Sequence, residues 1–286
     1  MVKQLKYAPF YLLSLFPFWI IQWFSSMVYF VLFHIIGYRK KVVFENLKNS
    51  FPNKTDKEIY EIGRKFYAHF CDVFLEALKL LTISPKNIQK RFQIKNIELF
   101  NQLYKEQKSI ILYSAHFGNW EWMTCFPLHS PYKFISFYQK LSNRYFDQFM
   151  LHLRQRFGNT CVESQSGFKE LIKNTRNKKL TITYVIGDQS PMSNSAIFWT
   201  DFLNQETGFL TGADRMAQKC NQVMIFPFVQ KPKRGYYQLE FKIIPMDEVQ
   251  DPIETYARFL EINIQKQPEL WLWSHRRWKR KRELKN

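Results

Sequence analysis

An uncharged stretch near the N-terminus places the strongest constraint on how this chain can fold. The 30 residues from Ala8 to Gly37 contain no Asp, Glu, Lys or Arg. A helix of about 20 predominantly apolar residues can cross the hydrocarbon core of a bilayer, and the apolar core of a signal peptide is shorter than this run. We therefore expect residues 1–38 to anchor the chain to a membrane and residues 39–286 to form one globular domain. A buried helical hairpin within that domain is the alternative.

Two prolines subdivide the uncharged stretch. Because proline is poorly tolerated inside a helix, Pro9 and Pro17 predict that the long helix begins near Phe18, with an interfacial piece before it. Trp19 and Trp23 are expected at the level of the lipid headgroups, where tryptophan is enriched. Basic residues flank both ends of the stretch, so the positive-inside rule alone does not fix its orientation.

The composition narrows the class of partner and the compartment. The formal net charge of +18 indicates acidic partners, and nucleic acid, anionic lipid headgroups and acidic carrier proteins all qualify. The four cysteines (Cys71, Cys125, Cys161, Cys220) are far apart and form no C-x-x-C pair, so we expect buried thiols in a reducing compartment. Because nothing indicates secretory processing, we expect the globular domain on the cytosolic face of the membrane.

Helical patterns are followed by an alternation of strands and helices. Residues 38–51 read as a short amphipathic helix, and Thr55 to Glu58 form a capping box ahead of a long helix with one apolar face. The expected strands are residues 109–113, 134–138, 180–186, 223–229 and 236–244, and the expected later helices are residues 145–157, 168–175 and 212–219. This alternation is typical of an α/β fold, a sheet with helices on both faces.

The segment SAHFGNWEW follows the first expected strand and holds the candidate reactive pair. On a continuous helix His116 and Glu121 would not share a face. A turn allowed by Gly118, followed by a helix that starts at Trp120 and is capped by Asn119, would point Glu121 back toward the imidazole. A carboxylate there suits an imidazole that takes the proton of a hydroxyl attacking a carbonyl. The alternative is a surface histidine with an unrelated glutamate nearby.

Several blocks in a fixed order carry a resemblance that covers nearly the whole chain. After the hydrophobic N-terminus come RKKVVFENLKNSFPN, SIILYSAHFGNWEW, YQKLSNRYFDQFMLHLRQRFG, VIGDQSP, FPF and PELWLWSHRRWK. In these blocks the chain resembles the lipid A biosynthesis lauroyl/myristoyl acyltransferases, membrane-bound relatives of the glycerolipid acyltransferases that carry H-x4-D. The resemblance implies a glycerolipid-acyltransferase-like mixed sheet flanked by helices, with an N-terminal hydrophobic membrane helix.

The resemblance also implies roles for residues of the motif and of the third block. His116 would be the general base for the acceptor hydroxyl, and Glu121 its partner. Arg154 falls at the position of an arginine linked to catalysis or acceptor binding, and the nearby Arg156 leaves the choice between the two open.

Asp188 and Gln189, in the VIGDQSP block, are the remaining residues that the resemblance places at the substrate. Asp188 matches an acidic residue associated with the site, and a polar residue that caps a strand end is its alternative reading. Both His116 and Asp188 follow expected strands, and open α/β sheets bind ligands outside the carboxyl ends of their strands.

The reaction that the resemblance implies is transfer of a fatty acyl group. The donor would be a thioester of acyl carrier protein, and the acceptor a hydroxyl of a 3-hydroxyacyl chain on a lipid A precursor, at the inner (cytoplasmic) membrane. The phosphates of the precursor and an acidic carrier both match a basic surface. Such a transfer needs a base and an oxyanion site but neither a metal nor another cofactor. We expect direct attack, because the chain contains no G-x-S-x-G nucleophile context.

The C-terminal run from Trp271 to Lys285 interleaves basic residues with tryptophans. This pattern is compatible with nucleic-acid binding, but the neighbouring hydrophobic segment favours a stretch that lies on an anionic membrane with its indoles at the headgroups. We expect no nucleic-acid partner. Two alternative functions remain: acyl transfer to a lysophospholipid or another lipid alcohol, and binding of membrane or nucleic acid without catalysis.

Overall fold

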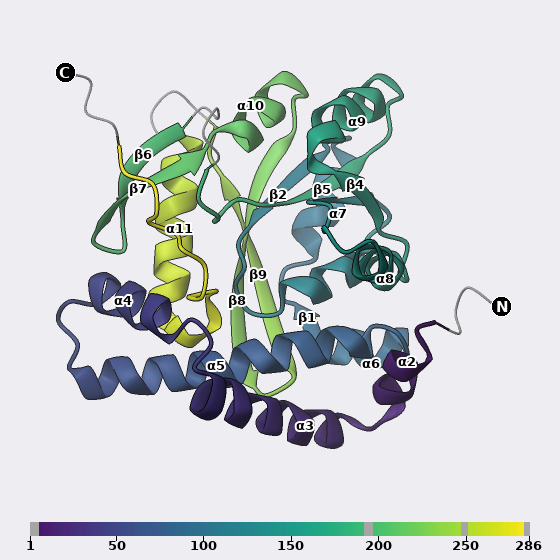
Figure 1. Cartoon of the computed structure of the whole chain (residues 1–286). Helices are drawn as coiled ribbons and strands as arrows, with labels where there is room; N and C mark the ends of the chain where they lie inside the picture. Colours follow the sequence, from purple (N-terminus) through teal and green to yellow (C-terminus); the bar gives the residue numbers. More distant parts are fainter. Residues whose placement is uncertain (1–5, 192–196, 247–250, 283–286) are drawn as a thin grey trace.

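A seven-stranded sheet forms the centre of the computed structural model, which describes residues 6–191, 197–246 and 251–282 (Figure 1). The strand order is β1-β9-β8-β2-β5-β3-β4. The strands from β8 to β4 are parallel to one another, whereas β9 is antiparallel to β8, and β1 is parallel to β9. The strands are β1 (Phe92–Ile94), β2 (Ile110–Ser114), β3 (Lys133–Tyr138), β4 (Thr160–Glu163), β5 (Thr181–Ile186), β8 (Val223–Lys233) and β9 (Tyr236–Ile244).

Helices flank this sheet, which confirms the α/β class. They are α2 (Ala8–Leu15), α3 (Phe18–Phe30), α4 (Lys40–Ser50), α5 (Asp56–Lys79), α6 (Pro85–Arg91), α7 (Glu98–Lys105), α8 (Arg144–Arg154), α9 (Ser164–Arg176), α10 (Gly212–Lys219) and α11 (Pro252–Lys266). Shorter helical pieces are a π-helix (Val31–Ile36) and two 3-10 helices (Trp120–Leu128 and Pro268–Leu270). An antiparallel pair, β6 (Ile197–Phe202) and β7 (Gln205–Leu210), forms a separate small sheet.

The expected strands and the long helix are confirmed. The strands expected at 109–113, 134–138, 180–186, 223–229 and 236–244 correspond to β2, β3, β5, β8 and β9. The capping box opens α5: the Glu58 backbone N–H donates to the Thr55 hydroxyl oxygen at 3.3 Å, and the Thr55 backbone N–H donates to the Glu58 carboxylate at 2.9 Å. The short strands β1 and β4 were not predicted, because three or four residues are too few to establish a period.

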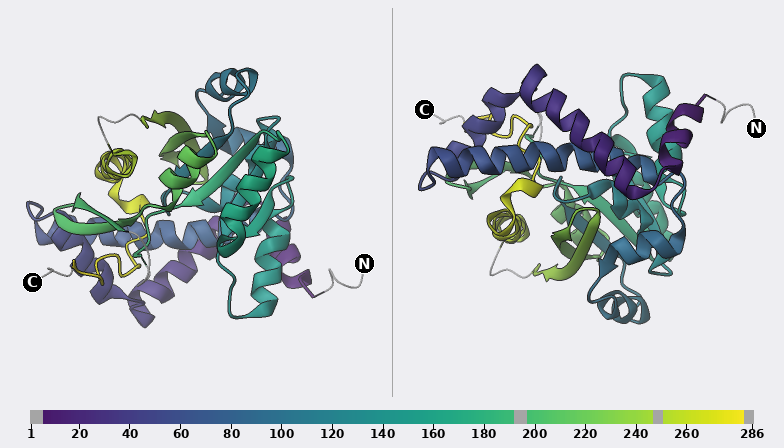
Figure 2. Two further views of the ribbon diagram at one scale, coloured as in Figure 1. Left: turned by 90° about the horizontal axis from the view of Figure 1, so that it is seen from above. Right: turned by 90° about the horizontal axis from the view of Figure 1, so that it is seen from below.

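The hydrophobic N-terminal helices form the outer layer at the base of the molecule. In Figure 1, α5 crosses beneath the central strands and α3 lies beneath α5, and the view from below in Figure 2 shows α3 running across α5. As predicted, α3 begins at Phe18, directly after Pro17, and a separate helix precedes it. Among the described residues, one helical stretch is long and apolar enough to cross a membrane, Phe18–Ile36.

One side of α3 is packed against the protein and the other is exposed. Ile21 and Ser25 are each 1% exposed on the packed side. Trp19 and Trp23 are 69% and 58% exposed on the other side. The helix is therefore integrated into the fold along one face and presents an apolar stripe along the opposite face.

The prediction for the C-terminal tryptophans was wrong. Trp271 and Trp273 are buried in the core rather than at the surface, and the Arg277 side chain between them and the C-terminus is buried too. Arg277 Nη2 donates to the carbonyl oxygen of Gly208 at 2.6 Å, whereas its buried Nε has no hydrogen-bond partner among the described residues. Alternating indoles and cations do not reveal from sequence which way each side chain points. Lys285, the last cation of the run, lies outside the described residues.

Candidate active site

The pairing of two neighbouring parallel strands brings His116 and Asp188 together. Strands β2 and β5 pair in parallel, with Ser114 opposite Ile186 at their carboxyl ends. His116 lies two residues beyond Ser114, and Asp188 lies two residues beyond Ile186. The same register that pairs the strands therefore places the imidazole beside the carboxylate, at the edge of an α/β sheet where ligands bind.

The contact between these two side chains fixes the orientation of the imidazole. His116 Nδ1 lies 2.8 Å from Asp188 Oδ1, and the His116 backbone N–H donates to Oδ2 at 2.9 Å. Because an ionised carboxylate only accepts hydrogen bonds, Nδ1 carries the proton and Nε2 is left as an acceptor. The side chain of His116 is 18% exposed, and within the described part of the chain Nε2 has no hydrogen-bond partner.

Trp271 completes this group, which we name the front cluster (His116, Asp188 and Trp271). The indole N–H of Trp271 donates to Asp188 Oδ2 at 2.8 Å. Burial raises the pKa of the Asp188 carboxyl, but the charge and hydrogen bonds of His116 and the indole of Trp271 outweigh burial and hold the pKa below its usual value. Asp188 is therefore ionised at neutral pH.

Glu121 has a different partner from the one predicted. Both of its carboxylate oxygens accept from the Arg154 guanidinium, Oε2 from Nε at 2.8 Å and Oε1 from Nη2 at 2.6 Å. Among the described residues, no hydrogen bond joins Glu121 to His116. Both oxygens of Glu121 are occupied by this bidentate arginine contact, and the carboxylate that holds His116 Nδ1 is that of Asp188.

The turn that carries the motif forms as predicted. Gly118 has φ +63°, in the left-handed region, and a Cβ at this position would lie 2.7 Å from a methyl group of Val229. The Asn119 side-chain oxygen accepts from the Trp122 backbone N–H at 3.2 Å and caps the helix that starts at Trp120. This helix is 3-10 rather than α.

The buried phenol of Tyr184 lies close enough to Glu121 and Asp188 for the charges of both carboxylates to act on it. Burial raises the pKa of its phenol, and the negative charges of Glu121 and Asp188 raise it further. The hydroxyl group donates to the Trp120 carbonyl oxygen at 3.3 Å. The pair of Glu121 and Arg154 and the front cluster are therefore neighbours around one buried phenol.

The remaining predicted residues lie apart from this arrangement. Arg156 donates from Nη1 to the backbone carbonyl oxygens of Leu80 and Ile83, the latter at 2.7 Å, and so holds the segment after α5. Of the two arginines, Arg154 is the one that contacts the motif. Gln189 is exposed, and no hydrogen bond connects it to another described residue.

A second histidine adjoins the site and was missed in the sequence. His275 Nε2 accepts from the Ser190 backbone N–H at 3.1 Å. Burial lowers the pKa of His275 to about 4, so this imidazole is neutral at physiological pH. Its place in the PELWLWSHRRWK block, beside Trp271, is the sequence signal that could have identified both residues.

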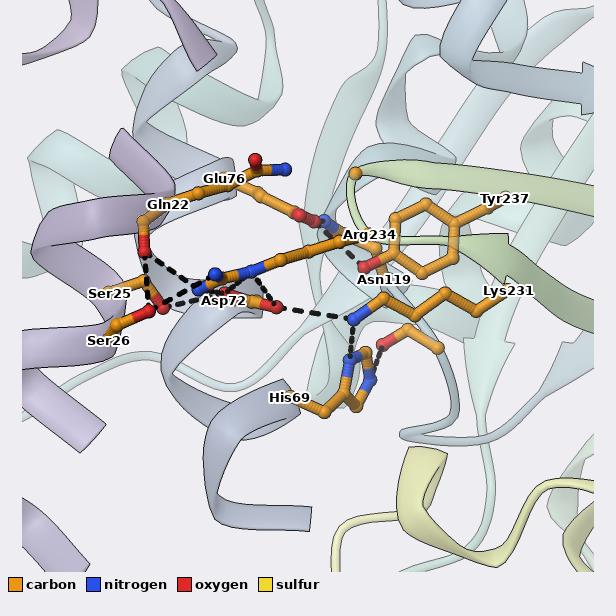
Figure 3. Close-up of polar contacts among 12 residues, drawn as sticks. Gln22, Ser25, Ser26, His69, Asp72, Glu76, Asn119, Lys231, Arg234 and Tyr237 are labelled. Atoms are coloured by element: carbon orange, nitrogen blue, oxygen red, sulfur yellow. Dashed lines mark hydrogen bonds and ion pairs between the residues drawn. The ribbon is translucent and has the colours of Figure 1, made fainter. Parts of the chain in front are cut away.

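A second group of polar side chains contacts the motif at Gly118 and Asn119 (Figure 3). We name it the rear cluster; it consists of His69, Asp72, Glu76, Lys231, Arg234 and Tyr237. His69 Nε2 lies 3.2 Å from the Gly118 carbonyl oxygen, and Glu76 Oε2 accepts from the Asn119 side-chain amide at 2.8 Å. These contacts fix the backbone of the turn that carries His116.

The rear cluster also ties α3 to the rest of the protein. The Asp72 carboxylate accepts from the Ser25 hydroxyl at 2.7 Å, from Arg234 Nη2 at 2.6 Å and from Lys231 Nζ at 3.3 Å. Arg234 Nη2 also donates to the backbone carbonyl oxygen of Gln22 at 2.8 Å. Figure 3 shows Asp72 between these partners from α3 and from the β8–β9 hairpin.

All four cysteines are free thiols, as expected. Cys71, Cys125 and Cys220 are buried, and Cys161 is half-buried. Burial raises the pKa of the Cys125 thiol, the thiol nearest to the motif in the sequence. The thiolate form that a nucleophilic cysteine needs is therefore disfavoured there.

The fold and the front cluster define a class of proteins, α/β proteins that hold an imidazole–carboxylate pair at the ends of adjacent parallel strands. Comparison with known proteins specifies the family. A family model described as bacterial lipid A biosynthesis acyltransferase matches residues 4–280. The chain is also similar to a lipid A biosynthesis acyltransferase of Haemophilus influenzae, with 25% identity over 234 residues, which cover 80% of this chain and 72% of that protein.

The chain therefore belongs to the bacterial lipid A biosynthesis acyltransferase family, as its sequence blocks predicted. This membership gives the protein an acyltransferase role in lipid A synthesis, with a lipid A precursor as substrate.

Proposed function

We propose that the protein transfers a fatty acyl group from the thioester of acyl carrier protein to the hydroxyl of a 3-hydroxyacyl chain on the lipid A precursor. The observation that carries this proposal is the His116–Asp188 pair. Nδ1 of His116 is held by the buried Asp188 carboxylate, and Nε2 of His116 is left as a hydrogen-bond acceptor. An oriented imidazole with a free nitrogen is the group that activation of an alcohol requires.

The reaction proceeds by direct attack. His116 Nε2 takes the proton of the acceptor hydroxyl while the oxygen bonds to the thioester carbonyl carbon. The tetrahedral intermediate then collapses, the carbon–sulfur bond breaks, and the sulfur leaves with the proton from the imidazolium. The products are the new ester and the free thiol of the donor. The raised pKa of the Cys125 thiol supports this route over an acyl-enzyme on that residue.

Asp188 acts through His116. Ionised and held by the Trp271 indole, it keeps the proton on Nδ1 and stabilises the imidazolium that forms when Nε2 takes the hydroxyl proton. Asp188 is therefore a positioning residue, in the role that the sequence had suggested for Glu121.

Glu121 serves to hold Arg154. Two of the guanidinium nitrogens, Nε and Nη2, are bound to the carboxylate, and Nη1 has no hydrogen-bond partner among the described residues. A guanidinium oriented in this way is suited to contact a substrate oxygen that gains negative charge, such as the thioester carbonyl in the tetrahedral intermediate. We assign this role to Arg154.

We also propose that the protein works at the inner membrane with the exposed stripe of α3 in contact with lipid. The stripe consists of large side chains on one side of the helix, Trp19, Trp23, Met27 and Phe30, each about half exposed or more. A contiguous exposed apolar patch of this kind marks an interaction surface, and tryptophan favours the headgroup level. The net charge of +18 favours an anionic leaflet and an acidic carrier.

The chemistry is tested with purified protein, the precursor and acyl thioesters of either acyl carrier protein or coenzyme A. We expect His116→Ala to lower the rate of ester formation by about 10²- to 10⁴-fold, the usual contribution of a general base. His34→Ala is the matched control, because this histidine is exposed on the N-terminal helical segment. Equal rates for the His116 variant and the wild type would refute the mechanism.

The acceptor is tested by mass spectrometry of lipid A from a deletion strain. We expect lipid A that lacks one acyl chain, restored by the wild-type gene and not by the His116→Ala gene. An unchanged acyl count would favour the alternative in which a lysophospholipid or another lipid alcohol is the acceptor.

A further inference from the structure

A cavity lies beside the rear cluster. It has a volume of about 560 Å³ and lies between α3, α5 and the turn of the β8–β9 hairpin. Neither the residues of the front cluster nor Glu121 and Arg154 line it. Part of its wall is apolar, formed by Tyr29, Phe30, Ala68 and Leu270, and the rest is polar and charged.

The charged part of the wall has an excess of cations. Four basic side chains line the cavity, Lys65, Lys231, Lys233 and Arg234, against two carboxylates, Asp72 and Glu269. Figure 3 shows how Arg234 and Lys231 converge on Asp72, which neutralises part of their charge.

Lys65 and Lys233 carry further positive charge, part of which is offset by Glu269 in the wall and, for Lys65, by the Glu61 carboxylate on the same helix. Both are exposed, and neither forms an ion pair with another residue that the structure describes. Lys233 Nζ lies 4.3 Å from the centre of the Tyr236 ring, an interaction that leaves its charge uncompensated. Among the described residues these two ammonium groups form no close ion pair, so the cavity offers them to an anionic ligand.

The cavity is continuous with the apolar stripe of α3. Phe30 belongs to both: it lines the cavity and is 55% exposed. From Phe30 the stripe runs back along the helix through Met27, Trp23 and Trp19, at steps of three or four residues. An apolar surface thus leads directly into a cationic recess, which is the complement of an amphiphile with a negatively charged head.

We propose that this cavity binds the phosphate headgroup of an anionic membrane phospholipid, with the acyl chains of the lipid along the exposed stripe of α3. Lys65 and Lys233 pair with the phosphate, and Tyr29, Phe30 and Ala68 contact the glycerol and the first methylene groups. The lipid held at this site would be neither the donor nor the acceptor of the acyl group.

The experiment uses a short-chain lipid that is soluble as a monomer. Dihexanoyl phosphatidylglycerol, below its critical micelle concentration, is titrated into the full-length protein by isothermal titration calorimetry. We expect saturable 1:1 binding, with much weaker binding of dihexanoyl phosphatidylcholine and of inorganic phosphate. Inorganic phosphate binding as tightly as the lipid would overturn the proposal, since the apolar part of the site would then play no role.

Two variants test the residues. Lys65→Gln/Lys233→Gln is expected to weaken lipid binding about 10- to 30-fold, since each basic residue near an anionic headgroup contributes roughly fivefold or more. The matched control is Lys169→Gln/Lys179→Gln, which removes the same charge from exposed positions on and just after α9. An equal effect of the two double variants would refute the assignment.

Ala68→Phe tests the cavity without a change of charge. The larger side chain fills part of the space, so we expect saturable lipid binding to be lost while the melting temperature stays close to that of the wild type. Wild-type affinity in this variant would show that the lipid binds elsewhere. These experiments measure lipid binding and not acyl transfer. A failure of the lipid-site proposal can therefore be distinguished from a failure of the proposed function.

Discussion

The front and rear clusters contain the same pair of residue types, a histidine and a nearby aspartate, in opposite electrostatic settings. His116 is partly exposed, and its nearest charged partner is the Asp188 carboxylate. His69 is buried, and its Nδ1 lies 3.1 Å from the Lys231 ammonium group. Burial, and after it the positive charge of Lys231, hold the pKa of His69 well below its usual value. The neutral imidazole of His69 bridges Lys231 and the Gly118 backbone, whereas His116 faces a carboxylate that stabilises the protonated form of an imidazole.

The carboxylates of the two clusters differ in the same way. Asp188 has a lowered pKa because His116 and Trp271 donate to it. Glu76, in the rear cluster, is buried, which raises its pKa to about 7, and within the described residues its Oε1 has no hydrogen-bond partner. In the proposed mechanism the front cluster moves a proton, whereas the contacts of the rear cluster hold a backbone turn. Changes in front should alter activity, and changes in the rear should alter stability.

The largest effect is expected for Asp188→Asn. The amide preserves the size of the side chain but removes the charge that stabilises the imidazolium, and it can hold the imidazole in the wrong tautomer. Acyl transfer should fall by about 10³- to 10⁴-fold. Steady-state kinetics and a thermal melt are the measurements. If the variant lost stability and kept its rate, Asp188 would be a structural residue like those of the rear cluster.

Glu76→Gln is expected to remove a pH-dependent part of the free energy of unfolding, which amounts to about 3 kcal/mol between pH 4.5 and pH 7. A carboxyl whose pKa rises from 4.5 in the unfolded chain to about 7 in the fold stabilises the protein fully below pH 4.5. That contribution is lost progressively as the pH rises from 4.5 to 7. The free energy of unfolding of the wild type should therefore fall across this range relative to that of the variant. Parallel curves from urea titrations at several pH values would contradict the raised pKa.

Arg154→Lys is expected to lower the rate of transfer by roughly tenfold, about 1.4 kcal/mol. Lysine keeps the charge but cannot form the bidentate contact with Glu121, so the cation is less well oriented toward the substrate. Arg156→Lys is the control for a nearby arginine, and its rate should match that of the wild type. Equal rates for all three proteins would remove Arg154 from the site.

The smallest effect is expected for Ser25→Ala, at about 1 kcal/mol of stability. The variant removes one hydrogen bond to Asp72, which keeps its contacts to Arg234 and Lys231. The rate of transfer should be unchanged, since Ser25 contacts Asp72 of the rear cluster and no residue of the front cluster. A lowered rate at wild-type stability would break the division between the clusters, because it would show that the seating of α3 influences the chemistry.

The elements that sequence predicted well are those with local signals. The strand before His116 and the strand before Asp188 are apolar runs, and the start of α5 is a capping box, so each could be recognised within a few residues. The partner of His116 could not. It is set by the register of β2 and β5 across 72 residues, and the nearer Glu121 was the only carboxylate that local spacing could offer.

Part of the rear cluster has a recognisable pattern in the sequence. His69, Asp72 and Glu76 follow a spacing of three and four residues next to the apolar face of α5, which places ionisable groups beside the core. Such groups are buried only when they have partners. Their partners on β8 and β9 are distant in sequence, so neither the identity of the partners nor the link to α3 could be predicted.

The packing of α3 bears on how the protein can be produced. Removal of an N-terminal hydrophobic helix is a common way to obtain a soluble fragment of a membrane-attached enzyme. Here that deletion would uncover the side of α5 that contacts α3, and would take from Asp72 and Arg234 their contacts to Ser25 and Gln22. We expect the shortened chain to aggregate rather than dissolve, so the intact polypeptide is the suitable starting material for crystals.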